Sequence, residues 1–240
     1  MMVRLIALTP LAERICGVAA RTRDSEWIPN TDDEGVSDAL GSAMDSGDFS
    51  VLEHATFTFA VEDISMICFH RLLGRGMGKH VQHSQPLLGP EGYWCVMPQS
   101  FRECGWRAHS LDPIHLTPVT YDMTDEFKAI VKDLQNAYRR LLKEGVPEED
   151  AQYILPMACA MDAVVTMDAR ELLGFIEENI CPRAHWEIRD LAERMRDLVV
   201  DVCPRMFRDA GPKCIRMGYC PEKNGCGRYP PKEAHKEVSQ

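Results

Sequence analysis

Three clusters of side chains have the types and spacing needed to bind an anionic ligand. The first is Glu53-His54, which directly precedes a segment that alternates threonine with aromatic residues. The second spans residues 70–85 and gathers His, Arg and Lys with amide and hydroxyl groups around several glycines. Glycine lets a backbone approach an anion closely, and neighbouring Arg or Lys supplies charge-assisted hydrogen bonds to phosphate. The glycine spacing is neither that of a P-loop nor that of G-x-G-x-x-G, so neither of those sites is indicated.

The third cluster starts at Asp168, includes Arg170 and Glu171, and continues over residues 181–189. A helix is expected to start at Asp168. Free N–H groups at a helix N-terminus attract anions, so Arg170 there would reinforce an anion site. A simpler alternative stays open for each cluster: His54 bonds a loop backbone, residues 70–85 form a solvated basic loop, and the arginines of the third cluster make surface ion pairs of little energetic worth.

The tail holds a further group of chemically active side chains, the thiols of Cys214, Cys220 and Cys226, each separated from the next by five residues. This spacing falls short of a repeated C-x-x-C pair. We therefore expect no metal site, since a structural metal would have to recruit a fourth ligand such as His235. Most of the other cysteines stand singly in apolar stretches and are expected to be small core residues.

The composition is that of a globular protein, with 240 residues, 45% hydrophobic and 27% charged. A formal net charge of −10 argues against general binding to nucleic acid or to an anionic membrane, because both need a broad cationic surface. The N-terminus lacks the pattern of a signal peptide, and no apolar run approaches the roughly 18 residues that span a bilayer. We therefore expect a cytoplasmic protein whose anionic ligands are held by local cations.

The hydrophobic pattern predicts both strands and helices. Residues 3–8, 55–62 and 157–166 have the pattern of strands, and Asp63 or Ser65 is expected to cap the helix that follows the second strand. Residues 79–118 are rich in Pro, Gly and His without clear periodicity, which is typical of a functional loop or an oligomer contact. The remaining expected helices span residues 11–21, 36–44, 124–144, 168–178 and 183–201, with a further one opening at Pro147.

Four segments, in order, resemble those of the flavin-dependent thymidylate synthases. Residues 50–59 (SVLEHATFTF) are similar to S-x-x-E-H-x-x-F-T-F, and residues 154–156 (ILP) are similar to V-L-P. Residues 166–173 (TMDARELL) resemble T-M-N-A-R-E-L-L, and residues 183–188 (RAHWEI) resemble R-A-Q-W-E-I. The tail from Ala210 to Pro221 also resembles that of many bacterial members.

The resemblance implies an α+β fold with a central antiparallel sheet flanked by long helices. It implies one domain over residues 1–240, with a Cys-, Pro- and Gly-rich tail over residues 203–240, and a homotetramer whose sites are shared between subunits. The implied reaction moves a methylene group from methylenetetrahydrofolate to C5 of dUMP, with FAD, reduced by NADPH, delivering the hydride. No cysteine nucleophile is implied.

The resemblance also implies which residues hold the ligands. For FAD the matching positions are His54, Thr56, Arg75, Gln82, Asp168 and Arg170. For the pyrimidine nucleotide they are Arg71, Ser84, Gln85, Gln152, Asn179 and Arg183.

The sequence departs from the family where the nucleotide is held. An R-H-R motif appears as Gly74-Arg75-Gly76, and the arginine that faces the pyrimidine is replaced by Asn179. Each guanidinium contributes roughly 1.5–3 kcal/mol through charge-assisted hydrogen bonds, so the losses would weaken dUMP binding by orders of magnitude unless Arg71, Arg75, Lys79 and Arg183 compensate. Two alternatives therefore stay open: an enzyme of the same fold with another acceptor, such as a modified pyrimidine or a nucleoside, and a non-catalytic ligand-binding protein.

Overall fold

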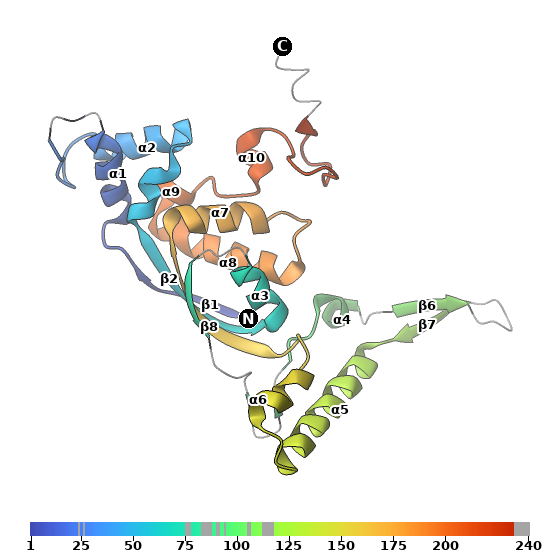
Figure 1. Cartoon of the computed structure of the whole chain (residues 1–240). Helices are drawn as coiled ribbons and strands as arrows, with labels where there is room; N and C mark the ends of the chain where they lie inside the picture. Colours follow the sequence, from blue (N-terminus) through green and yellow to red (C-terminus); the bar gives the residue numbers. More distant parts are fainter. Residues whose placement is uncertain are drawn as a thin grey trace. The chain divides into compact units, whose positions relative to one another are not determined.

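The structure is a computed structural model (Figure 1), and it describes residues 1–23, 25, 27–74, 78–82, 88–89, 92–93, 95–104, 107–111 and 118–232. The chain divides into two compact units. The first is Met1–Glu62, Arg71–Gln82 and Ala163–Gln240, and the second is Asp63–His70 and His83–Asp162. The expectation of a single domain stays a prediction.

A four-stranded sheet provides the frame of the first unit. Its order is β1 (Met2–Leu8), β2 (Thr56–Ser65), β8 (Ala160–Asp168) and β3 (Lys79–Gln82). β1 runs antiparallel to β2 with an irregularity between Leu5 and Ala7, and β3 runs antiparallel to β8 with Lys79 opposite Thr166. The prediction of an α+β fold built on an antiparallel sheet is confirmed.

Alternation along β2 gives the sheet one buried face. Phe57, Phe59 and Val61 are fully buried, whereas the intervening Thr58 is only half-buried and shares a 3.0 Å hydrogen bond with the Thr166 hydroxyl of β8. A period of two is what a half-buried strand requires, because successive side chains point to opposite faces. Phe57 meets Phe207 edge to face at 5.4 Å between ring centroids, so the buried face packs against the C-terminal helices.

Seven helical segments complete the first unit in the part of the chain that the structure describes. Two of them, α1 and α2, pack so closely that a Cβ on Gly17 would lie 2.3 Å from the Val36 carbonyl oxygen, so only glycine fits there. Figure 1 shows α7 and α8 side by side along the sheet. The segments are α1 (Ala12–Thr22), α2 (Val36–Ser46), η1 (Phe49–His54), α7 (Ala169–Asn179), α8 (Trp186–Val202), α9 (Pro204–Phe207) and α10 (Lys213–Met217).

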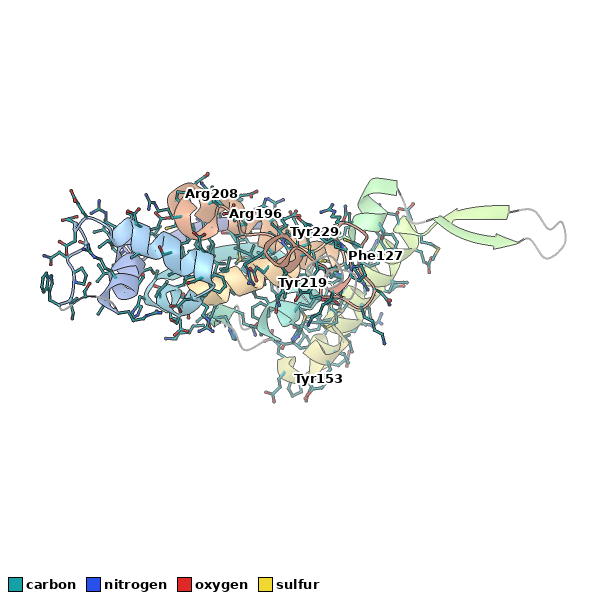
Figure 2. All side chains as sticks on the ribbon, turned by 90° about the horizontal axis from the view of Figure 1, so that it is seen from above. Phe127, Tyr153, Arg196, Arg208, Tyr219 and Tyr229 are labelled. Carbon is teal, nitrogen blue, oxygen red and sulfur yellow. The ribbon has the colours of Figure 1, made fainter. Side chains whose placement is uncertain are left out.

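The second unit centres on the long helix α5 (Thr124–Lys143), which ends before Gly145 with its φ of 84°. The buried Tyr138 of α5 donates a hydrogen bond to Glu148 at 3.4 Å, and Tyr153 lies 89% exposed (Figure 2). The other elements described in this unit are β4 (Leu88–Gly89), β5 (Gly92–Tyr93), α4 (Gln99–Cys104), β6 (Arg107–Leu111), β7 (Pro118–Asp122), α6 (Glu148–Ala151) and η2 (Gln152–Ile154). α3 (Met66–Leu73) begins in this unit and ends in the first.

Several predicted boundaries differ from the structure. β2 continues to Ser65 and α3 begins at Met66, because the Ser65 hydroxyl accepts the Cys68 N–H at 3.1 Å and caps the helix. Asp63 is not the cap, and its N–H donates to the Asp162 carboxylate at 3.0 Å. The helix predicted to open at Pro147 is present as α6 and continues as η2 to Ile154, with Pro147 as the cap residue and not the first residue of the helix. Residues 79–118, predicted to be irregular, contain short strands and α4 in their described part.

Candidate functional site

The start of α7 brings the first and third clusters together. The Ala169 N–H donates to the Ala55 carbonyl oxygen at 2.8 Å, which places the end of β8 beside the end of η1. The Arg170 guanidinium forms an ion pair with the Glu53 carboxylate, and both side chains are about half exposed. His54 and Thr56, which flank this contact in sequence, are also exposed. The structure therefore gathers His54, Thr56, Asp168 and Arg170 around one helix end, as four of the predicted FAD ligands would require.

The Glu171 carboxylate ties the second cluster to the same helix end. One of its oxygens accepts the Gly78 N–H and the other accepts the Asp168 N–H, each at 3.1 Å. Gly78 has a φ of 74°, and a Cβ there would lie 2.8 Å from the Thr166 carbonyl oxygen, so the close approach requires glycine. The backbone of Gly78, from the second cluster, thus meets Glu53-His54 and Asp168–Glu171 at the N-terminus of α7.

The backbone N–H groups of this helix end are already bonded within the chain. The Asp168 carboxylate accepts the Glu171 N–H at 2.8 Å and also bonds the Arg170 N–H, while Ala169 bonds Ala55. Together with the bond from the Asp168 N–H to Glu171, this is a capping box. The expectation of free N–H groups for an anion at this helix start is therefore wrong, and Arg170 would have to act through its side chain.

Three carboxylates, those of Glu53, Asp168 and Glu171, lie at this helix end, and Glu53 pairs with Arg170. Burial raises the pKa of Asp168 above its ordinary value, and the neighbouring charges of Glu171 and Glu53 raise it further, while the bonded N–H groups oppose the shift. Among the residues described here, the local charge is thus more negative than a diphosphate prefers. Further cations must come from another part of the site.

Two of the expected nucleotide ligands, Arg71 and Arg183, lie in the first unit but not at the start of α7. Arg71 is exposed on α3, and its charge helps to lower the pKa of His185, although burial of the imidazole is the larger cause. His185 Nδ1 accepts the Glu187 N–H at 3.4 Å and caps α8. Arg183, also exposed, precedes that cap by two residues. Arg71 thus shares an electrostatic environment with the segment that carries Arg183.

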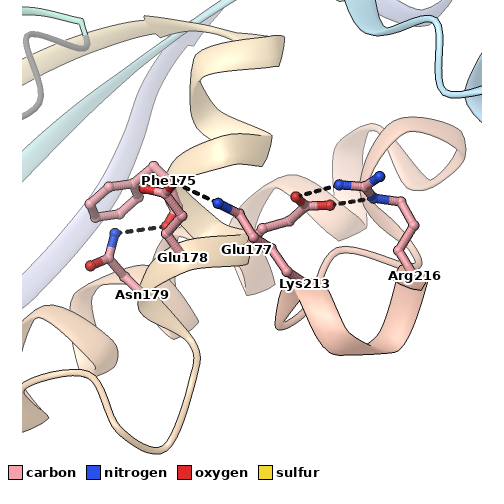
Figure 3. Close-up of polar contacts among 6 residues, drawn as sticks. All are labelled: Phe175, Glu177, Glu178, Asn179, Lys213 and Arg216. Atoms are coloured by element: carbon pink, nitrogen blue, oxygen red, sulfur yellow. Dashed lines mark hydrogen bonds and ion pairs between the residues drawn. The ribbon is translucent and has the colours of Figure 1, made fainter. Parts of the chain in front are cut away.

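Asn179 ends α7, and its side-chain amide donates to the Phe175 carbonyl oxygen at 2.8 Å (Figure 3). Gln82 is exposed at the end of the edge strand β3. Gln152 lies in η2 of the second unit. Arg75, Ser84 and Gln85 lie outside the described residues.

Comparisons with known proteins identify the family of this chain. A model of the thymidylate synthase complementing protein family matches residues 4–205. A flavin-dependent thymidylate synthase from Geobacter sulfurreducens is 36% identical over 225 residues, covering 92% of this chain and 89% of the relative. Enzymes of the same name from Nitratidesulfovibrio vulgaris and Sulfolobus acidocaldarius are 36% and 34% identical and cover 80% and 90% of this chain, with 76% and 78% of their own lengths matched. The chain belongs to this family.

Family membership confirms the resemblance drawn from the four sequence segments, all of which lie within the matched residues 4–205. Sequence reasoning did not single out the pairing role of Glu171 with Gly78. The spacing D-x-x-E from Asp168 to Glu171 would have indicated that Glu171 accepts the Asp168 N–H in a capping box. The hydrogen bond from Gly78 to Glu171 could not be predicted in this way, because the two residues are far apart in sequence.

No helix in the described part of the chain has the length and apolar character needed to cross a bilayer. Likewise, no group of three or more His, Cys, Asp or Glu side chains forms a ready-made metal site among the residues that the structure describes.

Proposed function

We propose that this chain is a flavin-dependent thymidylate synthase that transfers a methylene group to C5 of dUMP. The observation that supports this function best is the convergence of Glu53-His54, Gly78 and Asp168–Glu171 at the start of α7, in a chain of this family. Methylenetetrahydrofolate as the one-carbon donor, NADPH as the reductant, a homotetramer and a cytoplasmic location are part of the same proposal.

The residues at the start of α7 fit a flavin nucleotide through side chains. Arg170 offers an exposed guanidinium, and Thr56 and His54 offer a hydroxyl and an imidazole beside it. The Thr56 hydroxyl is held by Thr9, with 3.1 Å between the two oxygens. Bound there and reduced, FAD supplies the hydride of the reaction.

The Glu53 carboxylate sets the orientation of the cation in the proposed site. It holds Arg170 before any ligand arrives, so less side-chain entropy is lost when the guanidinium engages a phosphate. The same carboxylate competes with that phosphate for Arg170. Binding therefore requires the guanidinium to be shared between the two anions, or the further cations of residues 71–79 to offset the charge of Glu53.

Flavin binding is tested by titrating FAD into the wild-type protein and into Arg170→Ala. Since hydrogen bonds to charged groups are worth about 1.5–3 kcal/mol, we expect Arg170→Ala to weaken FAD affinity by roughly 10- to 100-fold. Arg194→Ala is a matched control, because Arg194 forms a comparably exposed ion pair with Asp190 on α8. A colourless wild-type protein that takes up no FAD contradicts the proposal.

The acceptor is tested at Arg71, the best-placed substitute for the guanidinium missing at Gly74. Arg71 lies about one helical turn before Gly74, so its long side chain can reach the space that an arginine at position 74 would fill. We expect Arg71→Ala to abolish dUMP binding in calorimetry while fold and FAD content are kept. Arg71→Lys, which keeps the charge but loses the planar fork, should bind with intermediate affinity.

A second candidate, an enzyme with a different acceptor, is favoured by one observation. Asn179 replaces the pyrimidine-facing arginine, and its amide is bonded to Phe175. If wild-type protein holds FAD but shows no binding at millimolar dUMP, this candidate takes the place of the first. Nucleosides and modified pyrimidines are then the acceptors to test.

A further inference from the structure

Four cysteines line one cavity of about 240 Å³ at the C-terminal end of the first unit. Cys181 follows α7, Cys214 lies in α10, and Cys220 and Cys226 belong to the tail. The sequence placed the last three at regular spacing, but Cys181 is more than thirty residues away and joins them only in the fold. All four thiols are free. A fourth thiol therefore lines the same cavity as the three of the tail, and it comes from the segment that follows α7.

Two ion pairs hold α10 against α7 and so bring Cys214 to this cavity. Arg216 forms a two-pronged pair with Glu177 at 2.8 and 2.9 Å, and Lys213 bonds Glu178 at 2.7 Å (Figure 3). Glu177 and Glu178 also line the cavity. Glu177 and Glu178 are thus each paired with a basic residue, which leaves the four thiols and the Glu222 carboxylate as the lining groups that can bind a cation.

The backbone of the tail wraps closely around Cys220. The Cys220 N–H donates to the Pro230 carbonyl oxygen at 2.7 Å, which closes a loop over the residues between them. A Cβ on Gly225 would lie 3.0 Å from the Cys220 sulfur, so the chain passes directly over that thiol. Gly218 and Gly227, with φ values of 72° and 84°, make the turns on either side of Gly225. The loop thus returns Cys226 to the side of Cys220.

This loop lacks a hydrophobic core of its own. Between residues 218 and 232, all of which the structure describes, Cys220 is the buried side chain, and residues 221–228 are exposed. A segment this small and polar needs a cross-link or a bound metal to hold a single conformation. Structural zinc sites built from four cysteines supply such a constraint in loops with few apolar contacts.

We propose that Cys181, Cys214, Cys220 and Cys226 bind one Zn²⁺ ion as tetrahedral thiolate ligands. The thiols line the cavity without forming a ready-made ligand set, so binding draws the sulfurs inward to about 2.3 Å from the metal. Four protons leave as four neutral thiols become thiolates, and no electron is transferred. The site is structural and uses none of the residues proposed to hold FAD and dUMP, although Cys181 lies between Asn179 and Arg183 in sequence. Zinc content can therefore be measured without reference to the proposed function.

The first test is the zinc content of the full-length protein, purified without chelator and measured by inductively coupled plasma mass spectrometry. The second test is alkylation of the thiols. We expect about one Zn²⁺ per chain for the wild type. Cys226→Ser should abolish the zinc, and because Cys226 is exposed this change leaves the core intact. Cys181→Ser should do the same from the α7 side. Cys95→Ser, which removes a partly buried thiol of the second unit, is the matched control and should keep the metal.

Alkylation distinguishes a zinc site from other uses of the same thiols. If zinc is bound, the four cysteines should resist iodoacetamide until a chelator is added, and X-ray absorption should show sulfur neighbours at about 2.3 Å. Three results overturn the proposal: wild-type protein that takes up no Zn²⁺ while the four thiols react freely, disulfides linking them, or a coloured iron–sulfur cluster with acid-labile sulfide.

Discussion

Asp168 does two jobs with opposite electrostatic requirements. As the cap of α7, its carboxylate accepts N–H groups, which stabilises the charged form. As a proposed FAD ligand, the same carboxylate stands close to Glu53 and Glu171, where burial and like charge raise its pKa. An uncharged residue of the same shape would still cap α7, and it would remove the negative charge from the proposed FAD site.

We therefore predict that Asp168→Asn binds FAD more tightly than the wild type, by several-fold, in fluorescence titration. Asparagine caps helices about as well as aspartate, but it carries no charge to repel a diphosphate. The folded-state pKa of Asp168 is raised, so ionising it costs stability as pH rises above the ordinary aspartate value of about 4. The melting temperature of Asp168→Asn minus that of the wild type should accordingly increase as pH rises from 4 to 7.

Asp168→Ala provides the control for this prediction. It removes the charge and also the cap, at a cost of about 1 kcal/mol, or about 2–4 °C in melting temperature. Equal FAD affinity in the wild type and Asp168→Asn would show that the carboxylate does not face the cofactor.

At the scale of elements, the sequence predicts those with a strong hydrophobic period or a clear cap. The α5 helix, predicted over residues 124–144, spans Thr124–Lys143, and the Thr-aromatic strand is present as β2. The helix expected over residues 168–178 is present as α7, which spans Ala169–Asn179 with Asp168 as its cap. These predictions succeed because the information is local to each element.

The predictions that fail depend on contacts between distant residues. The contacts of Gly78 with Thr166 and Glu171 cannot be predicted from the local pattern, because both partners lie roughly ninety residues later in the sequence. Cys181 joins the tail cysteines for the same kind of reason.

The cap of α8 predicts a pH dependence of stability. His185 Nδ1 accepts the Glu187 N–H only while the imidazole is neutral, and its pKa is lowered by burial and by Arg71. With the folded-state pKa below the unfolded value of about 6.5, the stabilisation is present above that pH and is lost as pH falls below it. His185→Asn, which caps without titrating, should show a flatter dependence of melting temperature between about pH 5 and 6.5.

Arg71→Ala checks the same electrostatic contact from the other side. Removing the guanidinium should raise the pKa of His185 in a proton NMR titration, because one of the two causes that lower it is gone. An unchanged His185 pKa would show that the charge of Arg71 does not act on the segment that carries Arg183 and His185.

At the scale of the whole molecule, we predict an oligomer in solution. Tyr153 is 89% exposed beside Gln152, and Val81 is 74% exposed on the edge strand β3. Exposed aromatic and apolar side chains of this kind favour interfaces. Phe101 lies within residues 79–118, which the sequence indicates as a functional loop or an oligomer contact, and it packs on Phe127 of its own unit with 5.1 Å between ring centroids.

Light scattering at micromolar concentration should return a mass of about four times the 27.2 kDa of one chain. Tyr153→Ser should lower that mass, whereas Tyr219→Ser in the tail should leave it unchanged. A wild-type mass equal to that of one chain would rule out the homotetramer and, with it, the sharing of sites between subunits.

The first unit is assembled from three separate stretches of chain, so its core cannot close while the protein is still being made. Phe57 packs on Phe207, roughly 150 residues later, and at about 5–20 residues per second the ribosome takes on the order of ten seconds to deliver that partner. During this interval β2 has β1 as a neighbour, but β8, the strand on its other side, has not been synthesised. An unpaired edge next to buried phenylalanines is prone to non-native association. We therefore expect residues 56–65 to be prone to non-native association until the last third of the chain has been synthesised.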